Sequence, residues 1–325
     1  VFYVISVFIF VRDTSDYRLY FILTVGVVVL NAFINQLYIR KFVRIRWCNI
    51  QLFKYIKPNI TLGIYTLMSS MYLTFNVMYL GLVSDNTEVG YYTTAFKLYS
   101  VLLGFFTAFT SVMLPRMSSL LANGENARFQ ELVDRSCSVV ATFCIPLILY
   151  GIILAPQIIY TLSGPEYEGA IFPMRIIMPA AFAVGMAQVL AIQILMPMKK
   201  DRVLLMASII GAIVSLLINL LVVPYVASVG SAVVLLCSEM VVAATYVVYV
   251  LSHRLARIPI RIVWENICYS LPGALVCWGC SRWIENEFVV VVCAVILAGT
   301  VWIIVQVIAK TSVGERMKSL LLLRR

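Results

Sequence analysis

Two apolar segments decide the fold, VLLMASIIGAIVSLLINLLVV at residues 203–223 and SVGSAVVLLCSEMVVAATYVVYVL at residues 228–251. The first contains no charged residue, and the second contains only Glu239. A transmembrane helix requires about 20 consecutive, mostly apolar residues. Each segment is long enough to cross a bilayer, so the sequence predicts two consecutive transmembrane helices in this region.

The rest of the chain has the same character. Of its 325 residues, 62% are hydrophobic and only 12% are charged, and the mean hydropathy is +0.97. So few polar residues cannot cover a water-soluble surface, which excludes soluble enzymes, nucleic-acid binders and disordered chains. We therefore predict an all-α polytopic membrane protein with about ten transmembrane segments. They lie at 1–11, 19–39, 58–83, 89–114, 136–160, 170–197, 203–223, 228–251, 264–281 and 288–309.

The distribution of charge predicts the orientation of these segments. Alternate connections hold 20 of the 25 lysines and arginines, whereas the opposite ends hold only Arg12, Arg18 and Arg282. Cytoplasmic loops of membrane proteins are enriched in basic residues. The net charge of +10 therefore reflects topology rather than nucleic-acid binding, and the C-terminus is predicted to be cytoplasmic.

Catalytic signatures are scarce. The one histidine, His253, stands at a helix end beside Arg254, so zinc sites and Ser-His-Asp triads lack their parts. There is no P-loop motif. The pair Cys277 and Cys280 has redox spacing but lies inside an apolar run, where cysteine acts as a small hydrophobe. We predict no enzymatic activity, no metal and no cofactor.

The informative residues are three ionisable side chains inside the spans, Lys97, Arg175 and Glu239. Each costs about 2.5–3.5 kcal/mol on insertion scales, so such residues are rare and often functional. Several prolines also fall within the apolar segments, where kinks are tolerated beside a cavity or a neighbouring helix. Together these features favour a transporter over a passive anchor or a structural scaffold.

An ordered set of short motifs runs through residues 58–251. Its members are SDNTEVGYYTTAFKL at 84–98, LPRMS at 114–118, LSGPEYEGA at 162–170, LMPMKK at 195–200, NLLVVP at 219–224, GSA at 230–232 and SE at 238–239. In order and spacing, this set resembles the polysaccharide flippases. These are the O-antigen, capsule and exopolysaccharide transporters of the multidrug/oligosaccharidyl-lipid/polysaccharide exporter superfamily.

The resemblance implies two six-helix lobes around a central cavity, followed by two accessory helices. On that template the chain begins within an apolar run as an N-terminally truncated piece. Residues 1–39 end the first lobe, 40–57 form a basic cytoplasmic linker, 58–251 form the second lobe, and 252–325 hold the accessory helices and a cytoplasmic tail. The linker is either an interfacial helix attracted to anionic headgroups or a plain topogenic loop, and both interpretations stay open.

The resemblance also implies a function. We expect a flippase that moves a polyprenyl-diphosphate-linked oligosaccharide from the cytoplasmic to the outer leaflet of the bacterial inner membrane by alternating access. Its partners would be this substrate, membrane lipids, a polysaccharide polymerase and glycosyltransferases, with no nucleic acid. The alternatives are a drug or metabolite exporter of the same superfamily and a membrane-embedded polysaccharide-assembly enzyme.

We expect Lys97, Arg175, Glu239 and Asn76 to bind the substrate. The two cations would offset the charge of the diphosphate, and Glu239 would balance them when the cavity is empty. Asn76 stands before a Leu-Gly pair where family members often carry Asp, which puts an ion or proton role at this position in doubt. The competing interpretation is a permanent Lys97–Glu239 ion pair, with Arg175 extending outward to the membrane surface.

Overall fold

The protein is described by a computed structural model, which covers residues 6–7, 10, 17–40, 52–257 and 259–309. Within these ranges the chain forms helices and turns without any strand, as the sequence predicts. The chain divides into two compact units, residues 1–55 and residues 56–325. The predicted segment at 1–11, the linker at 40–57 and the C-terminal tail fall largely outside the described residues.

The first unit contains α2 (Tyr17–Ile39), an apolar helix whose side chains are mostly exposed within this chain. The helix α3 (Leu52–Val83) begins in the first unit and forms the first long helix of the second. Its inward face is marked by Asn76 and Leu80, which are buried. Both helices coincide with predicted spans.

The helix α4 (Asn86–Ala122) begins where the Asp85 carboxylate accepts a hydrogen bond from the Glu88 backbone N–H at 2.9 Å. This is the usual role of an aspartate at a helix N-cap. Gly124 then ends the turn after α4 with a φ of 72°, and α5 (Asn126–Ile153) follows. The helix α4 extends beyond its predicted span at both ends, whereas α5 begins ten residues before its predicted span and ends before residue 160.

The predicted span at 136–160 and the predicted span at 170–197 are both broken in the structure. The chain from residue 155 to residue 195 forms α6 (Ala155–Ser163), the 3-10 turn η2 (Pro165–Ala170), α7 (Ile171–Ile177), α8 (Ala180–Gln188) and the π-helix η3 (Val189–Leu195). The second part bends by 45° at Pro179, which cannot donate a backbone hydrogen bond. Neither break was predicted from the hydropathy pattern.

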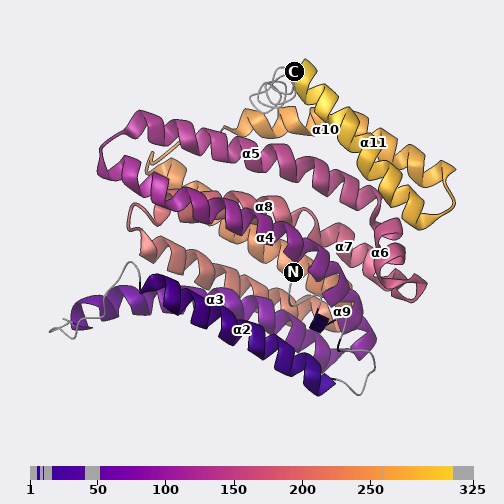
Figure 1. The fold of residues 1–325 in the computed structure, drawn as a ribbon, viewed down its shortest axis with the longest axis horizontal. Helices are drawn as coiled ribbons and strands as arrows, with labels where there is room; N and C mark the ends of the chain where they lie inside the picture. The colour runs from indigo at the N-terminus through magenta and orange to yellow at the C-terminus, as the bar shows by residue number, and fades with distance from the viewer. Residues whose placement is uncertain (1–5, 8–9, 11–16, 41–51, 258, 310–325) are drawn as a thin grey trace. The chain divides into compact units, whose positions relative to one another are not determined.

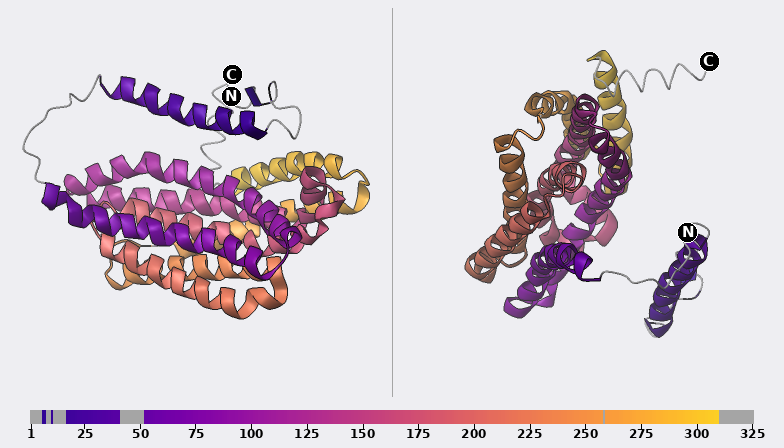
Figure 2. Two further views of the ribbon diagram at one scale, coloured as in Figure 1. Left: turned by 90° about the horizontal axis from the view of Figure 1, so that it is seen from below. Right: turned by 90° about the vertical axis from the view of Figure 1, so that its left-hand side faces the viewer.

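The element α9 (Asp201–Ser252) contains both segments that decided the fold. Helical geometry fails at Val226 and at Ala227, whose φ is 42°. A Cβ added to Gly230 would lie 2.9 Å from Val223 Cα, so the two backbones meet across a tight reversal. Figure 2 shows the resulting hairpin of two antiparallel helices. Each half has about 25 residues and is about 37 Å long, enough to cross a hydrocarbon core of about 30 Å.

Two further helices, α10 (Ile260–Trp283) and α11 (Glu287–Ile308), follow. They pair with each other; α10 packs against α5, and α11 packs against α6 (Figure 1). A buried hydrogen bond from the Gln306 amide to the Asn266 side-chain oxygen joins them at 3.2 Å. Their positions agree with the two predicted C-terminal spans.

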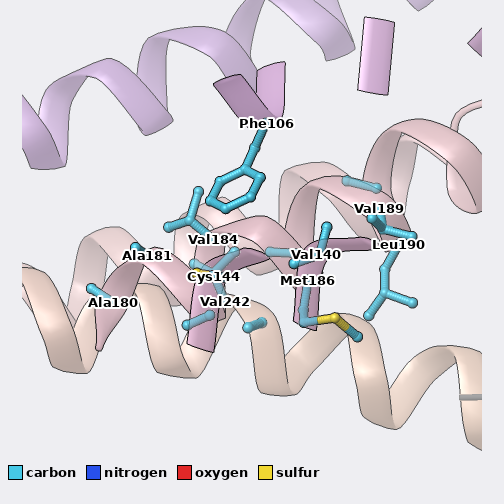
Figure 3. Close-up of a cluster of buried hydrophobic side chains, with 14 of the residues drawn as sticks. Phe106, Val140, Cys144, Ala180, Ala181, Val184, Met186, Val189, Leu190 and Val242 are labelled. Atoms are coloured by element: carbon cyan, nitrogen blue, oxygen red, sulfur yellow. The ribbon is translucent and has the colours of Figure 1, made fainter. Parts of the chain in front are cut away.

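The core of the second unit lies between α4, α5, α8 with η3, and α9. Figure 3 shows Phe106, Val140 and Val184 meeting near Cys144 in this core. A Cβ added to Gly185 would lie 2.8 Å from Val140, so the small residue lets α8 approach α5. Close approach at small residues is typical of helix packing in membranes.

By length and composition, six helices of the described residues could cross a membrane, or seven if the bent pair at Pro165–Ile177 and Ala180–Leu195 is one span. One of the six is α9, which holds two predicted spans in a single element. The protein is therefore an all-helical, multi-pass membrane protein, and its fold class is confirmed.

Candidate functional site

One face of α4 carries a polar stripe. Lys97, Ser100, Gly104, Thr107 and Ser111 follow one another at spacings of three and four residues, and all five are exposed. Residues at this spacing lie on the same side of a helix. The buried residues of α4, among them Tyr92, Tyr99 and Phe106, lie on other faces. The helix thus presents a continuous polar surface inside an apolar span.

The hydroxyl groups of the polar stripe are already satisfied by their own helix. The Ser100 hydroxyl donates to the Lys97 carbonyl at 2.6 Å, and the Ser111 hydroxyl donates to the Thr107 carbonyl at 2.7 Å. The Gln188 amide of α8 donates to the Thr107 hydroxyl at 3.1 Å. The stripe is therefore fixed in place and anchored to the bent span.

Lys97 is the one charged member of the polar stripe. Counting about 1.5 Å per residue from Glu88 at the end of the span, it lies roughly 13 Å deep in the membrane. An ammonium group at that depth is unfavourable in lipid, so intramembrane lysines face a water-filled cavity or another part of the protein. Lys97 is exposed on α4 in this chain.

A second polar group lies inside the helix bundle. The Asn76 side chain of α3 is 1% exposed, and its amide donates to the Tyr92 hydroxyl at 2.9 Å and to the Ser231 carbonyl at 3.0 Å. Asn76 therefore ties α3 to α4 and to the second half of α9. Because the amide nitrogen supplies both hydrogen bonds, an aspartate could not replace it without loss.

Glu239 lies in the same interior, 6% exposed, on the second half of α9. Its carboxyl group lies near the hydroxyls of Tyr65, Tyr92 and Tyr246, and the side chains of Tyr65 and Tyr246 are hydrogen-bonded to each other. We call Asn76, Tyr92, Glu239, Tyr65 and Tyr246 the tyrosine cluster. A buried carboxyl group requires such polar neighbours to compensate for its lost hydration.

Arg175 lies apart from both groups. It is exposed on α7, and its Nε donates to the Ile152 carbonyl near the end of α5 at 3.2 Å. This bond uses one of the five N–H donors of the guanidinium, so the others are directed elsewhere. The contact holds the side chain against the end of α5 rather than against the stripe.

The structure thus brings two of the four predicted site residues together. Asn76 and Glu239 share the tyrosine cluster, whereas Lys97 and Arg175 are exposed on α4 and α7. Among the described residues, ion pairs join Arg128 to Glu125, Arg135 to Glu131 and Arg261 to Glu265. The pair of Lys97 with Glu239 that the competing interpretation requires is not one of them.

The motifs at the predicted outer end meet in space. Glu88 accepts a hydrogen bond from the Ser228 backbone N–H at 3.0 Å, which fastens the α9 reversal to the start of α4. Tyr91 packs edge-on against Tyr167, and a Cβ added to Gly169 would overlap the Tyr91 ring. These residues belong to the motifs that resemble the polysaccharide flippases. In this structure they hold the helix ends together, which is a structural role.

An apolar cavity of about 410 Å³ opens between helices α4 to α7 and helices α10 and α11. Leu98 and Val101 of α4 line it, next to the residues of the polar stripe. Phe143 and Trp302, whose tilted rings lie 5.7 Å apart, also line it. The cavity has the size and chemistry to hold a hydrocarbon chain.

Sequence reasoning missed the tyrosines of the tyrosine cluster. Tyrosine usually lies at the membrane surface, where its hydroxyl reaches water. Tyr65, Tyr92 and Tyr246 stand within predicted spans, and that position was the available signal. Gln193 of η3 is a polar amide that the sequence places within a span; it is fully buried, and its side chain has no hydrogen-bond partner among the described residues.

Comparisons with known proteins agree with this architecture. The family described as "Polysaccharide biosynthesis protein" matches residues 20–172. A curated protein of Escherichia coli (strain K12), named "Putative O-antigen transporter", is 26% identical over 189 residues. The match covers 57% of this chain and 45% of that protein, so the chain spans about half the length of this relative.

Two solved structures share the fold. The lipid II flippase MurJ in an inward closed conformation aligns with a TM-score of 0.67 and 13% identity, covering 83% of this chain and 57% of that one. An outward-facing multidrug resistance MATE family transporter of the MOP superfamily aligns with a TM-score of 0.50 and 15% identity, covering 77% and 61%. The resemblance stated from the sequence motifs is therefore confirmed: this chain is similar to polysaccharide biosynthesis proteins over residues 20–172 and shares the helical fold of these two transporters.

Proposed function

We propose that the protein to which this chain belongs is a flippase that moves a polyprenyl-diphosphate-linked oligosaccharide across the bacterial inner membrane. The observation that carries the proposal is the polar stripe of α4 with Lys97 exposed deep within a span. A passive anchor gains nothing from such a residue, whereas a translocation path for a charged headgroup needs one.

The positive charge of Lys97 would compensate for part of the negative charge of the transported diphosphate. A diphosphate brings two or more negative charges into a region of low dielectric, and only fixed cations offset the loss of their hydration. Lys97 supplies a mobile point charge, and the hydroxyls beside it supply weak polar contacts for the sugars. Arg175, which retains free N–H donors, would bind phosphate oxygens when the headgroup leaves the stripe.

The apolar cavity supports the same substrate class. It adjoins α4 beside the polar stripe, so a polyprenyl chain could rest in it while the headgroup follows the stripe. Glu239 and Asn76 would then act from the tyrosine cluster on the position of α3 and α9 rather than by direct contact with the phosphates. Alternating access would move this lobe against a second one.

The division of the chain into segments would follow the two-lobe arrangement of the polysaccharide flippases. Residues 1–39 would end the first lobe, 40–57 would link the lobes on the cytoplasmic side, 58–251 would form the second lobe, and 252–325 would add the accessory helices and a cytoplasmic tail. The bias of basic residues supports a cytoplasmic C-terminus. Oligosaccharide polymerases and glycosyltransferases would be the functional partners, because they supply and consume such a substrate.

The test is transport by variants of the full-length protein. We expect Lys97→Ala to fold normally and to lose transport of the lipid-linked sugar, and Lys97→Arg to retain part of it. Exchanging the two charges, with Lys97→Glu and Glu239→Lys together, should stay inactive because the residues do not form an ion pair. Lys200→Ala, which removes an exposed lysine outside the spans, is the matched control.

Three outcomes would contradict the proposal. Full transport by Lys97→Ala would remove the stripe from the translocation path. Restored transport in the charge exchange would support the permanent ion pair. Export of small amphiphilic compounds that does not depend on Lys97 would favour the drug or metabolite exporter, whose fold is similar.

A further inference from the structure

A second basic site lies far from the polar stripe, where α9 ends and the chain turns toward α10. A pocket of about 510 Å³ is lined there by Gln130, Leu251, Arg254, Leu255, Ala256 and Arg257. Arg254 and Arg257 are exposed, whereas Ala256 is 7% exposed. The pocket thus combines two guanidinium groups with an apolar wall.

The chain at this pocket is held rigidly. The Gln130 side chain of α5 accepts a hydrogen bond from the Arg257 backbone N–H at 2.9 Å and donates to the Arg257 carbonyl at 3.0 Å. The same amide nitrogen also donates to Asp134 at 2.8 Å. Both polar groups of one backbone unit are therefore bound to a helix 127 residues away. A pocket fixed in this way loses little entropy when a ligand binds.

The arginines of the pocket are not neutralised by acids. Arg261, the next basic residue, pairs with Glu265, and the acids of α5 pair with Arg128 and Arg135. Arg254 and Arg257 take part in no ion pair among the described residues. Asp134 is the acid closest to the pocket in the hydrogen-bond network, and it is bound to Gln130. The pocket therefore carries excess positive charge.

Arg254 also occupies a backbone conformation that favours glycine. Its φ is 51°, its N–H bonds to the Leu251 carbonyl at 3.1 Å, and the Leu255 N–H bonds to the Val250 carbonyl at 3.0 Å. These two bonds form the Schellman motif that ends a helix, in which the left-handed residue is usually glycine. An arginine here is tolerated at a cost in backbone strain.

We propose that this pocket binds the phosphate of an anionic phospholipid headgroup in the membrane leaflet at that end of α9. The two arginines would bind the phosphate oxygens, and Leu251 and Leu255 would contact the first carbons of the acyl chains. Its place at the end of a long apolar helix puts it at the depth of the headgroups. Basic pockets between transmembrane helices commonly bind such lipids. This inference does not depend on the transported substrate.

The strained position supplies a test variant that should fold. Arg254→Gly removes the charge and relieves the left-handed strain, so a loss of lipid binding cannot be explained by misfolding. Lys199→Gly is the matched control. Lys199 has a φ of 56° in the same motif, with its N–H bonded to Met196 at 3.0 Å, and it lies outside the pocket.

The experiment is native mass spectrometry of the purified full-length protein with phosphatidylglycerol or phosphatidylcholine. We expect selective retention of phosphatidylglycerol, weakened on the order of tenfold to thirtyfold when Arg254→Gly and Arg257→Gln are combined. Lys199→Gly should leave the retention unchanged. Gln130→Ala should weaken it to a lesser degree, because the arginines would keep their charge and lose their fixed position.

Three results would overturn the proposal. Equal retention by the wild type and the double arginine variant would show that the pocket does not bind the lipid. Equal retention of the two lipids would show that the phosphate is not recognised by charge. Displacement of the lipid by millimolar glycerol 3-phosphate or inorganic phosphate would identify a soluble anion as the ligand.

Discussion

The contact between Gly230 and Val223 gives a sharp test of the α9 reversal. A Cβ at position 230 would lie 2.9 Å from Val223 Cα and 3.2 Å from Val223 N. Carbon atoms attract one another best at about 3.5–4.0 Å, so the new methyl group would be roughly 0.6–1 Å too close. Its neighbours are backbone atoms, which cannot move aside by a change of rotamer. The two halves of α9 would have to separate.

The expected change in the free energy of unfolding for Gly230→Ala is the difference between a steric loss and a gain in helix propensity. Overpacking of this kind costs about 1–3 kcal/mol, and the value should lie near the upper end because backbone meets backbone. Alanine in place of glycine in a helix returns about 0.5–1 kcal/mol. We therefore expect Gly230→Ala to lower the free energy of unfolding by about 1–2 kcal/mol.

Two matched variants separate the steric effect from the glycine effect. Gly279 of α10 has no atom within 4 Å of an added Cβ, so Gly279→Ala should stabilise the protein slightly. A Cβ on Gly211 would lie 2.5 Å from the Val242 side chain, so Gly211→Ala should also destabilise the protein, and Val242→Ala should relieve that loss. Unfolding in mixed micelles measures all of them. If Gly230→Ala and Gly279→Ala behaved alike, the close approach at the reversal would be refuted.

Three further predictions concern other contacts. A double-mutant cycle of Asn76→Ala and Tyr92→Phe should give a coupling free energy of about 0.6–1.7 kcal/mol, the range for hydrogen bonds between membrane helices, and no coupling would contradict the bond. Gly169→Ala should destabilise by about 1–3 kcal/mol, and Tyr91→Ala should relieve part of this loss, measured by unfolding; independent, additive effects would argue against the overlap. A cysteine introduced as Asn86→Cys in a cysteine-free background should react with an impermeant maleimide from outside the cell, and labelling only from the cytoplasm would reverse the topology.

Hydropathy predicted the helices but not their breaks. The spans at 19–39 and 288–309 match α2 and α11 closely, because each is one apolar run bounded by polar residues. The span at 170–197 was predicted as one helix, yet it bends at Pro179 and continues as the π-helix η3. A proline is visible in the sequence, but whether it bends a helix depends on which neighbours satisfy the freed carbonyls.

The residues of the candidate site could be identified from the sequence, but their grouping in space could not. The cost of burying charge identified Lys97, Arg175 and Glu239 as unusual from the sequence alone. Which of them share a surface depends on helix rotation, and apolar residues occur on every face of α4 and α9, so the sequence pattern does not reveal it. The structure places Glu239 among tyrosines and Lys97 on the opposite side of α4 from its buried residues.

The hairpin of α9 has a consequence for how the protein is made. Its reversal, from Pro224 to Ser228, contains no charged residue, and its two halves are joined without a loop. Such a pair can leave the ribosome, form its helices and enter the bilayer from the lateral gate of the translocon as one unit, since only a few uncharged residues have to cross. Glu239 is then carried inward with its partner helix already alongside. Glu88 is synthesised more than a hundred residues earlier. Its carboxylate can therefore accept the hydrogen bond from the Ser228 backbone N–H as soon as the hairpin has inserted, and this bond then holds the reversal in place.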